Sequence, residues 1–322
     1  MKKTTVSVAG CSLADILYAD IDFTAPAFTA CASKKDGDGG LAPGKLVFAD
    51  ALEAFTGKSY PELKRALTGG RAPHAENLGG PAIVGAINAS QILSDLPVTF
   101  KFYGATGNDG TADFLRSIIA KTPLDASNYV TLPGASPSTD VLSDPRAHEG
   151  KGERTFINTI GACYTYTPEQ LPDAFYEADI IWFGATALVP SFHEKLSVLL
   201  KRSHEAGKIN VVSTVFDFIN EMRNPDKPWP MGDGTESYKY IDLLIVDWEE
   251  AVRLSGKSDL TEISGFLSSS GVSSFVITHG AKDFYVWSDG RVFRKTPLTP
   301  YPVSALVDED LAADPSLRGD TT

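Results

Sequence analysis

The sequence predicts an α/β fold in which a mainly parallel sheet is covered by helices on both faces. After Pro168, short and continuously apolar segments alternate with helical segments, which is the pattern of buried parallel strands joined by helices. Near the N-terminus, residues 6–10 form a further short apolar run that ends in glycine. With 322 residues, of which 43% are apolar, the chain is long enough for one large domain of this kind. We therefore expect a Rossmann-like three-layer α/β/α sandwich.

The individual elements are expected in the following chain order. Short apolar runs predict strands at residues 6–10, 98–104, 178–184, 209–215, 243–246 and 274–278. Apolar residues at helical spacing predict helices at residues 49–67 (with a break near 57–60), 81–93, 111–120, 191–206, 249–254 and 260–268. Residues 275–287 predict a strand, a tight turn and a second strand, and the Gly- and Pro-rich residues 24–44 predict a loop.

A second, smaller sheet is expected to form a lid on a single domain that spans residues 1–322. Residues 17–23 alternate apolar side chains with acidic ones, which is the period of a half-exposed strand. Residues 130–158 also contain short strand-like runs, broken by a polar loop. The lid strands are therefore predicted near residues 17–23, 45–48, 72–78 and 130–158, between strands of the main sheet in chain order.

Charge and cysteine content argue against several classes of function. The formal net charge is −12, from 29 basic and 41 acidic residues, so neither nucleic acid nor an anionic membrane is expected as a partner. Cys11, Cys31 and Cys163 are too few and too widely spaced for a disulfide framework or a Cys-x-x-Cys zinc site, which indicates a reducing cytoplasm. Residues 8–11 resemble a lipoprotein cleavage box, but the stretch before them is too short and polar for a signal peptide.

Asp15 is the first candidate for binding chemistry. It closely follows the first predicted strand, at the carboxyl end where open α/β sheets bind ligands. A carboxylate accepts hydrogen bonds from two hydroxyl groups, and charge-assisted bonds are stronger than neutral ones. The alternative is a helix N-cap or a solvated aspartate in a turn.

Two glycine-rich turns follow Asp15 in the chain. Gly79 and Gly80 precede a proline at a predicted helix start, and glycine lets the backbone approach a ligand closely. Such a pair is also an ordinary helix start in most proteins. The turn with Gly104 and Gly107 lacks the Gly-Lys-Ser/Thr ending of a phosphate-binding Walker motif, so a structural turn is favoured there.

Residues 240–287 contain candidate groups for binding a nucleotide and a metal ion. An apolar strand runs into Asp247-Trp-Glu-Glu250, and Mg²⁺ prefers oxygen ligands and keeps several waters. Acidic residues at a helix N-terminus can also serve the helix dipole alone. Thr278-His-Gly280 follows the next strand as a tight turn. The chain contains no Gly-x-Ser-x-Gly elbow, and its first strand has no Gly-x-Gly-x-x-Gly, so neither a serine hydrolase nor a dinucleotide oxidoreductase is supported.

Taken in this order, the segments resemble the ribokinase-like (PfkB) carbohydrate kinases over nearly the whole chain. The resemblance implies a ribokinase-like fold with a β lid, and ATP-dependent phosphorylation of a hydroxyl group on a small sugar. It implies that Asp15 takes hydrogen bonds from sugar hydroxyls and that the backbone of Gly79 and Gly80 approaches the substrate. It also places a carboxylate that can reach the substrate at Glu153, although an exposed strand glutamate is an equal alternative.

On the nucleotide side, the resemblance implies that Thr278 and Gly280 contact ATP. It further implies that Glu250 helps to hold Mg²⁺ and its waters near the phosphates, with Asp247 at the position of the family's Asn. Positioning and charge neutralisation would then supply most of the catalysis.

The chain departs from the family pattern at several positions. Val84 stands where the family signature has an Asn that contacts the sugar, and Asn77 or Asn88 could compensate for this loss. Cys163 replaces another Asn, and Asp283 replaces the second Gly of the nucleotide turn.

The chain ends inside the family's catalytic signature, after Asp320-Thr-Thr322. The catalytic Asp is therefore expected beyond Thr322, and the 322-residue chain is expected to transfer phosphate poorly or not at all. Two alternatives stay open: a nucleoside kinase of the adenosine type, and a non-catalytic relative that binds a sugar or a nucleotide. A homodimer formed through exposed lid strands is a further expectation.

Overall fold

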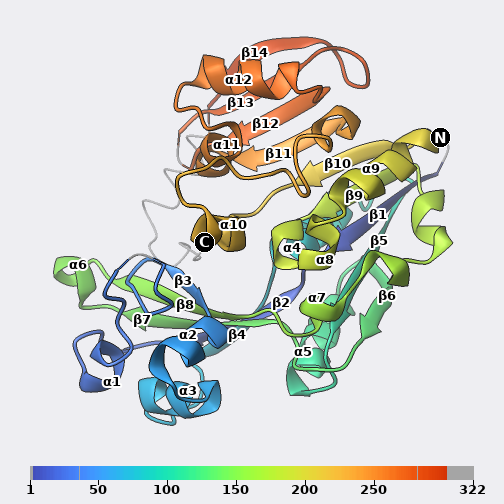
Figure 1. Ribbon diagram of the computed structural model, residues 1–322. Helices are drawn as coiled ribbons and strands as arrows, with labels where there is room; N and C mark the ends of the chain where they lie inside the picture. Colours follow the sequence, from blue (N-terminus) through green and yellow to red (C-terminus); the bar gives the residue numbers. More distant parts are fainter. Residues whose placement is uncertain (1–2, 36, 281, 303–322) are drawn as a thin grey trace.

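The computed structural model describes residues 3–35, 37–280 and 282–302 (Figure 1). Within them, one sheet of nine strands contains β1 (Thr4–Gly10), β5 (Val98–Thr106), β6 (Asp125–Thr131), β9 (Ile180–Gly184), β10 (Ile209–Ser213), β11 (Leu243–Asp247), β12 (Ser274–Thr278), β13 (Phe284–Ser288) and β14 (Thr296–Tyr301). A separate sheet of five strands contains β2 (Leu13–Tyr18), β3 (Leu46–Phe48), β4 (Ala75–Gly79), β7 (Ser138–Asp144) and β8 (Glu153–Thr159).

The large sheet has the strand order β14-β13-β12-β11-β10-β9-β1-β5-β6. The neighbouring strands from β6 to β12 all pair in parallel, and β13 and β14 add an antiparallel hairpin at one edge. Along the chain, the sheet grows from β1 to β5 and β6, and then from β9 to β12 on the other side of β1. The direction of growth therefore reverses between β1 and β9. In open α/β sheets, ligands bind at the carboxyl ends of the strands at such a switch point.

The α-helices are α1 (Pro26–Thr29), α2 (Ala49–Thr56), α3 (Tyr60–Thr68), α4 (Pro81–Ile92), α5 (Gly110–Ile119), α6 (Ala147–Gly150), α7 (Ala162–Thr165), α8 (Pro190–His193), α9 (Leu196–Glu205), α10 (Phe218–Arg223), α11 (Trp248–Ser255) and α12 (Leu260–Ser269). Helix α4 packs on β1, β5 and β9, while α9 packs on β10 and α11 packs on β11 and β12. The predicted α/β fold with a parallel sheet is therefore confirmed. In the part of the chain that the structure describes, no helix has both the length and the apolar composition that a membrane crossing needs.

The small sheet has the strand order β3-β8-β7-β2-β4, and helices cover one of its faces. Ala14, Ile16 and Tyr18 of β2 join an apolar cluster with Leu52 of α2 and Leu63 of α3. Because side chains alternate along a strand, the odd-numbered residues of β2 point to the opposite face. Figure 1 shows α2 and α3 on the side of the small sheet that lies away from the large sheet. We call the small sheet with these helices the lid.

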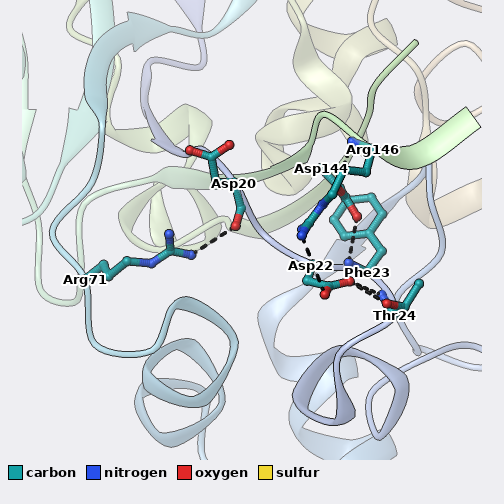
Figure 2. A network of polar contacts seen from close by, with 7 residues as sticks. All are labelled: Asp20, Asp22, Phe23, Thr24, Arg71, Asp144 and Arg146. Atoms are coloured by element: carbon teal, nitrogen blue, oxygen red, sulfur yellow. Dashed lines mark hydrogen bonds and ion pairs between the residues drawn. The ribbon is translucent and has the colours of Figure 1, made fainter. Parts of the chain in front are cut away.

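The first lid strand, β2, starts earlier in the chain than the predicted residues 17–23 and overlaps them only at Leu17 and Tyr18. The strand β2 ends before Asp20, which adopts a left-handed backbone with φ 57°. The turn is held by side chains from elsewhere in the lid, because Arg71 donates a hydrogen bond to the Asp20 carbonyl (3.4 Å) and the Phe23 amide donates to Asp144 (2.9 Å), as Figure 2 shows. The alternating pattern therefore covers the end of a strand and a turn, which local periodicity does not separate.

Two other predicted segments also differ from the structure. The helix predicted at residues 191–206 is two helices, α8 and α9, because Lys195 between them leaves the helical backbone region (φ −119°, ψ 14°). The segment 24–44, predicted as a loop, contains the short helix α1, which Phe28 anchors in the lid cluster. In contrast, the helix with a break near residues 57–60 is confirmed as α2 and α3.

Candidate active site

The carboxyl ends of β1 and β9 form the edge of the switch point. Gly10 at the end of β1 pairs with Gly184 at the end of β9. A Cβ atom on Gly10 would lie 2.1 Å from the Gly184 carbonyl oxygen and 2.5 Å from the Cβ atom of Ala82 in α4. Glycine at the end of β1 is therefore required for α4 to pack this closely against the sheet. The packing places the start of α4 beside the segment that leads from β1 into the lid.

Asp15 lies on β2, on the face of the lid opposite to α2 and α3. A Cβ atom on Gly79 would lie only 2.0 Å from Asp15 Oδ2, so the carboxylate rests against the backbone of the turn before α4. Gly80 caps that helix with φ 98°, a backbone conformation that glycine adopts readily. The structure thus brings Asp15, Gly79 and Gly80 together at the switch point.

The Asp15 carboxylate has no hydrogen-bond partner among the described residues, and burial raises its pKa to about 6. Buried charged groups in proteins are usually paired, because removal from water is costly unless hydrogen bonds compensate for it. A half-buried carboxylate without a protein partner is therefore suited to accept hydrogen bonds from a ligand.

Asp15 belongs to a row of polar side chains that crosses the lid. In the register of the sheet, it pairs with Asn77 on β4 and with Thr139 on β7, and Thr139 pairs with Asn158 on β8. Directly paired residues share one face of a sheet, so these four side chains, which we call the polar row, lie side by side. Asn158 Nδ2 donates a hydrogen bond of 2.9 Å to Thr139 Oγ1. The sequence pattern did not reveal this row, because it depends on the pairing of distant strands.

The polar row is open at one end and closed at the other. Asn77 is exposed, whereas Thr139 and Asn158 are only 5% and 3% exposed. Beyond Asn158, the register continues to Phe48 on β3, whose ring meets the ring of Phe218 of α10 edge-on, with the centroids 6.3 Å apart. This contact joins the lid to the body of the protein. A ligand therefore has access to the row from the side of Asn77 and Asp15.

A second row on the same face of the lid is entirely apolar. On each strand, the residue two positions away from the polar row, on the side away from the switch point, pairs with its neighbours in the same way. These residues form the apolar row: Ala75, Leu17, Val141, Phe156 and Leu46. Val141 is buried, and the other members are half-buried. The lid thus offers hydrogen-bonding groups next to the switch point and an apolar surface further out.

The predicted nucleotide-side residues lie on the same edge of the large sheet, at the ends of β11 and β12. Asp247 and Thr278 pair in the register of these two strands. The β11 end is three strands away from β1, which corresponds to roughly 14 Å at about 4.8 Å for each strand spacing. Both groups of predicted residues therefore line one edge, because parallel strands all end there.

Asp247 and Glu250 form a capping box at the start of α11. The Asp247 side chain accepts hydrogen bonds from the amides of Glu249 (2.7 Å) and Glu250 (3.4 Å), and Glu250 Oε2 accepts from the Asp247 amide (3.2 Å). Glu250 Oε2 also accepts from the Thr214 hydroxyl (2.5 Å), and burial raises the pKa of the Glu250 carboxyl group. These contacts hold both carboxylates firmly at the edge.

The donor set at this position suits Mg²⁺ only together with other ligands. The described residues contain no group of three His, Cys, Asp or Glu side chains that could hold a metal ion. Mg²⁺ usually keeps several waters and binds one or two carboxylates together with substrate phosphates. Glu250 and Asp247 fit that mode of binding, whereas a site built from protein ligands alone is not present in the described part of the chain.

Thr278 and Gly280 are both exposed at the end of β12. Gly280 has φ 55°, and an added Cβ atom would meet no atom of the described residues within 4 Å, so these residues leave the space in front of the turn open. Between them, the His279 ring stacks on Trp248, the first residue of α11, with the centroids 4.5 Å apart and the planes 7° apart. The stack ties the turn to the start of α11.

Glu153 is the one predicted substrate-binding residue that the structure does not bring to this group. It lies at the start of β8, five positions from Asn158, which corresponds to roughly 17 Å along a strand. By the alternation of the strand, it also points to the other face. Its carboxylate pairs instead with His148 Nε2 at 2.9 Å. Residues 320–322, which were assigned to the catalytic signature, lie outside the described residues.

A contact chain next to Glu250 was not predicted from the sequence. Thr186 Oγ1 lies 2.9 Å from His193 Nδ1, and His193 Nε2 lies 3.2 Å from Asp217 Oδ2. These residues and Glu250 line a cavity of about 20 Å³, which has room for about one water molecule. These contacts link the loops after β9 and β10, so they support the sheet edge that carries Glu250.

Several solved structures with the same fold are named as kinases of a small sugar or a nucleoside. Adenosine kinase from Trypanosoma brucei brucei superposes with a TM-score of 0.65 at 13% identity, over 95% of this chain and 86% of that chain. Ribokinase from Thermotoga maritima gives 0.61 at 16% identity, over 94% and 78%. Fructokinase with bound ATP from Xylella fastidiosa gives 0.60 at 16% identity, over 94% and 74%. At these identities, the likeness shows the ribokinase-like fold.

A comparison with family models identifies the chain more directly. No curated protein sequence matches the chain. The model of the pfkB family carbohydrate kinases, however, matches residues 77–305, which is well over half of the sequence. The match begins at Asn77 in the polar row and includes Gly79, Gly80, Glu250 and Thr278. The chain therefore belongs to the pfkB family of carbohydrate kinases.

Proposed function

We propose that the protein is an ATP-dependent phosphotransferase that phosphorylates a hydroxyl group of a small sugar. The observation that carries this proposal is the arrangement of two groups on one edge of the sheet. Asp15, which has no hydrogen-bond partner among the described residues, lies on the lid strand β2 beside the switch point, and Glu250 and Thr278 lie at the ends of β11 and β12. Such an edge can hold an acceptor hydroxyl and a donor phosphate side by side.

In this proposal the residues of the chain act mainly by positioning. Asp15 accepts hydrogen bonds from substrate hydroxyls, and the turn at Gly79 and Gly80 forms the floor beneath them. The lid, held to the body by Phe48 and Phe218, keeps water away from the acceptor. Phosphoryl transfer requires little covalent participation of the protein, so correct placement and charge stabilisation are the main requirements.

Thr278 and Gly280 would contact ATP, because both are exposed at the open turn after β12. Glu250 and Asp247 would hold Mg²⁺ through its waters next to the phosphates. The ion would neutralise part of the charge on the transferred phosphoryl group. No residue of the described part is assigned as the catalytic base.

Replacement of Glu250 by Gln is expected to reduce the effect of Mg²⁺ on ATP affinity. The substitution keeps the size of the side chain but removes the charge that would attract the hydrated ion. Groups that act on a metal through its first ligands typically contribute 10–100-fold in affinity. Titration calorimetry of ATP with and without Mg²⁺ measures the effect. Glu249→Gln is the matched control, since it removes the same charge from an exposed residue in the first turn of α11 that is not assigned to the ion. A Mg²⁺-dependent gain in ATP affinity that is the same in Glu250→Gln as in the wild type would contradict the assignment.

A nucleoside kinase is the second candidate, and the apolar row supports it. A plain sugar is polar on most sides, whereas a nucleoside joins hydroxyl groups to a flat and largely apolar ring. The lid has a matching division, because the polar row, which includes Asp15, lies next to the apolar row. Burial of apolar surface contributes about 25 cal/mol for each Å² that is removed from water.

A panel of acceptors distinguishes the two candidates. The protein as its gene encodes it is incubated with ATP, Mg²⁺ and D-ribose, D-fructose or adenosine, and ADP formation and acceptor affinity are measured. Phosphorylation of a sugar supports the main proposal. An affinity for adenosine at least about tenfold higher than for D-ribose, corresponding to about 1.4 kcal/mol of ring burial, supports the second candidate. Absence of acceptor-dependent ADP formation with all three would contradict both.

The proposal also covers the oligomeric state and the cellular compartment of the protein. β3 and β4 are the edge strands of the lid sheet, and edge strands can pair with a second copy, so we propose a homodimer through the lid. Cys11, Cys31 and Cys163 are all free and buried, which fits a reducing compartment such as the cytoplasm.

A further inference from the structure

One substrate contact of the family pattern is missing at the start of α4. Val84 stands at the position of the family's sugar-binding Asn, and it leaves an apolar side chain 42% exposed. The sequence offers two exposed amides nearby that could replace it, Asn77 and Asn88. The structure separates these two candidates, because they lie on different elements.

Asn88 is badly placed to replace the missing contact. It lies on α4, seven residues after the first residue of the helix, Pro81. At 1.5 Å per residue, this corresponds to about 10 Å along the helix axis, away from the end that meets Gly79 and Asp15.

Asn77 lies directly beside Asp15. The two residues pair across β4 and β2, so their Cβ atoms lie about 5 Å apart on the same face of the lid. Asn77 is exposed at the open end of the polar row. Neither side chain forms a hydrogen bond with the other or with another described residue, although an amide and a carboxylate bond readily when their geometry allows it.

We propose that Asn77 is a further substrate-binding residue, which together with Asp15 binds two adjacent hydroxyl groups of the substrate. This inference rests on the proposed function. An ionised carboxylate only accepts hydrogen bonds, whereas the Asn amide offers two donors and one acceptor. One hydroxyl donates its hydrogen to Asp15, and its neighbour bonds to the Asn77 amide. The site therefore selects a vicinal diol, and Asn77 supplies the amide that Val84 lacks.

The hydrogen bond behind Asp15 helps to hold the diol. Asn158 donates to Thr139 Oγ1, so the Thr139 hydroxyl hydrogen is free to point along the row, toward Asp15. Thr139 can therefore donate to a substrate hydroxyl that is bound at Asp15. Hydrogen-bond donors thus lie on both sides of Asp15 along the row. They fix the position of the substrate hydroxyl from which Asp15 accepts a hydrogen bond.

A cycle of protein and ligand changes tests the role of Asn77. Titration calorimetry of the whole chain uses adenosine and D-ribose, together with 2′-deoxyadenosine, 3′-deoxyadenosine and 2-deoxy-D-ribose, which each lack one hydroxyl of the diol. Asn77→Ala is expected to weaken a diol probe about three- to tenfold, the usual effect of one neutral hydrogen bond. For the analogue that lacks the hydroxyl bound by Asn77, the same substitution is expected to change nothing.

Two further variants complete the experiment. Asn88→Ala is the matched control and is expected to bind every probe as the wild type does. Asn77→Asp keeps the size of the side chain but removes its donors beside Asp15, so it is expected to weaken the diol probes at least as much as Asn77→Ala. An Asn77→Ala effect that is absent, or equal for all analogues, overturns the assignment. A wild-type chain that binds neither adenosine nor D-ribose overturns the diol selectivity, while the acceptor panel and the ATP titration still decide the kinase proposal separately.

Discussion

Replacement of Asp15 by Asn is expected to abolish most substrate affinity while it stabilises the free protein. The carboxylate would accept a charge-assisted hydrogen bond of about 1.5–3 kcal/mol from one substrate hydroxyl, so its loss corresponds to a decrease in affinity of about 10–10²-fold. The same carboxylate is costly to the free protein, because it is partly removed from water without a partner. Function and stability therefore move in opposite directions.

The sign of the stability change follows from the pKa of Asp15. Burial raises this pKa from its ordinary value of 3.8 to about 6. Between these two pH values, the folded protein binds more protons than the unfolded chain, so stability falls as the pH rises from about 4 to about 6 and stays lower above that range. At 1.36 kcal/mol for each pKa unit, removal of the charge at pH 7.5 stabilises the fold by up to about 3 kcal/mol.

Denaturant unfolding and ligand titration between pH 4.5 and 8 measure the two effects of Asp15→Asn. Wild-type affinity for the acceptor is expected to fall as the pH drops through about 6, because protonation removes the acceptor charge of Asp15. Asp20→Asn is the matched control, since it makes the same chemical change at an exposed lid position whose left-handed backbone Asn tolerates. Destabilisation of the fold by Asp15→Asn at pH 7.5 would contradict the unpaired state of this carboxylate.

Replacement of Gly10 by Ala is expected to destabilise the protein by about 3 kcal/mol. The new Cβ atom would lie 2.1 Å from the Gly184 carbonyl oxygen and 2.5 Å from the Ala82 Cβ atom. All three contacting atoms belong to the backbone or to an alanine Cβ that cannot rotate away, so β1, β9 and α4 must separate. Overpacking in a well-packed core typically costs 1–3 kcal/mol, and this site is at the upper end because it offers no flexible neighbour.

Gly265→Ala provides the opposite control for the same substitution. Gly265 is exposed inside α12, and an added Cβ atom would meet no atom within 4 Å. Alanine is favoured over glycine in a helix interior by about 1 kcal/mol, so this variant is expected to be more stable than the wild type. Urea unfolding of both variants checks the pair. Equal stability of Gly10→Ala and the wild type would show that α4 does not pack against the strand ends as described.

The sequence predicted the large sheet well, because its strands carry a local signal. Buried parallel strands are continuously apolar, and residues 178–184 and 274–278 were located as β9 and β12 within two residues at each end. The lid was harder to predict. Residues 17–23 alternate like a strand, but β2 ends at Tyr18, before the left-handed backbone of Asp20, and contacts from Arg71 and Asp144 hold that turn.

The site shows the same division between local and distant information. Asp15, Gly79 and Gly80 were singled out because they belong to short motifs, and the structure places them side by side. Glu153 was assigned by motif as well, but the structure places it at the far end of β8. Asn158 on the same strand lies in the polar row instead, five positions away and on the opposite face. Local sequence does not show which position of a strand reaches the crevice.

By itself, the sequence determined the α/β class, the family pattern and the motif residues at the sheet edge, since these depend on periodicity and short spacings within one segment. Only the tertiary structure decided which side chains share a surface. The row from Asn77 to Asn158 and the contact between Phe48 and Phe218 join strands and helices that lie far apart in the chain. The physical reason is strand register: a shift of one residue turns every side chain to the other face, and register is set by pairing partners that no single segment contains.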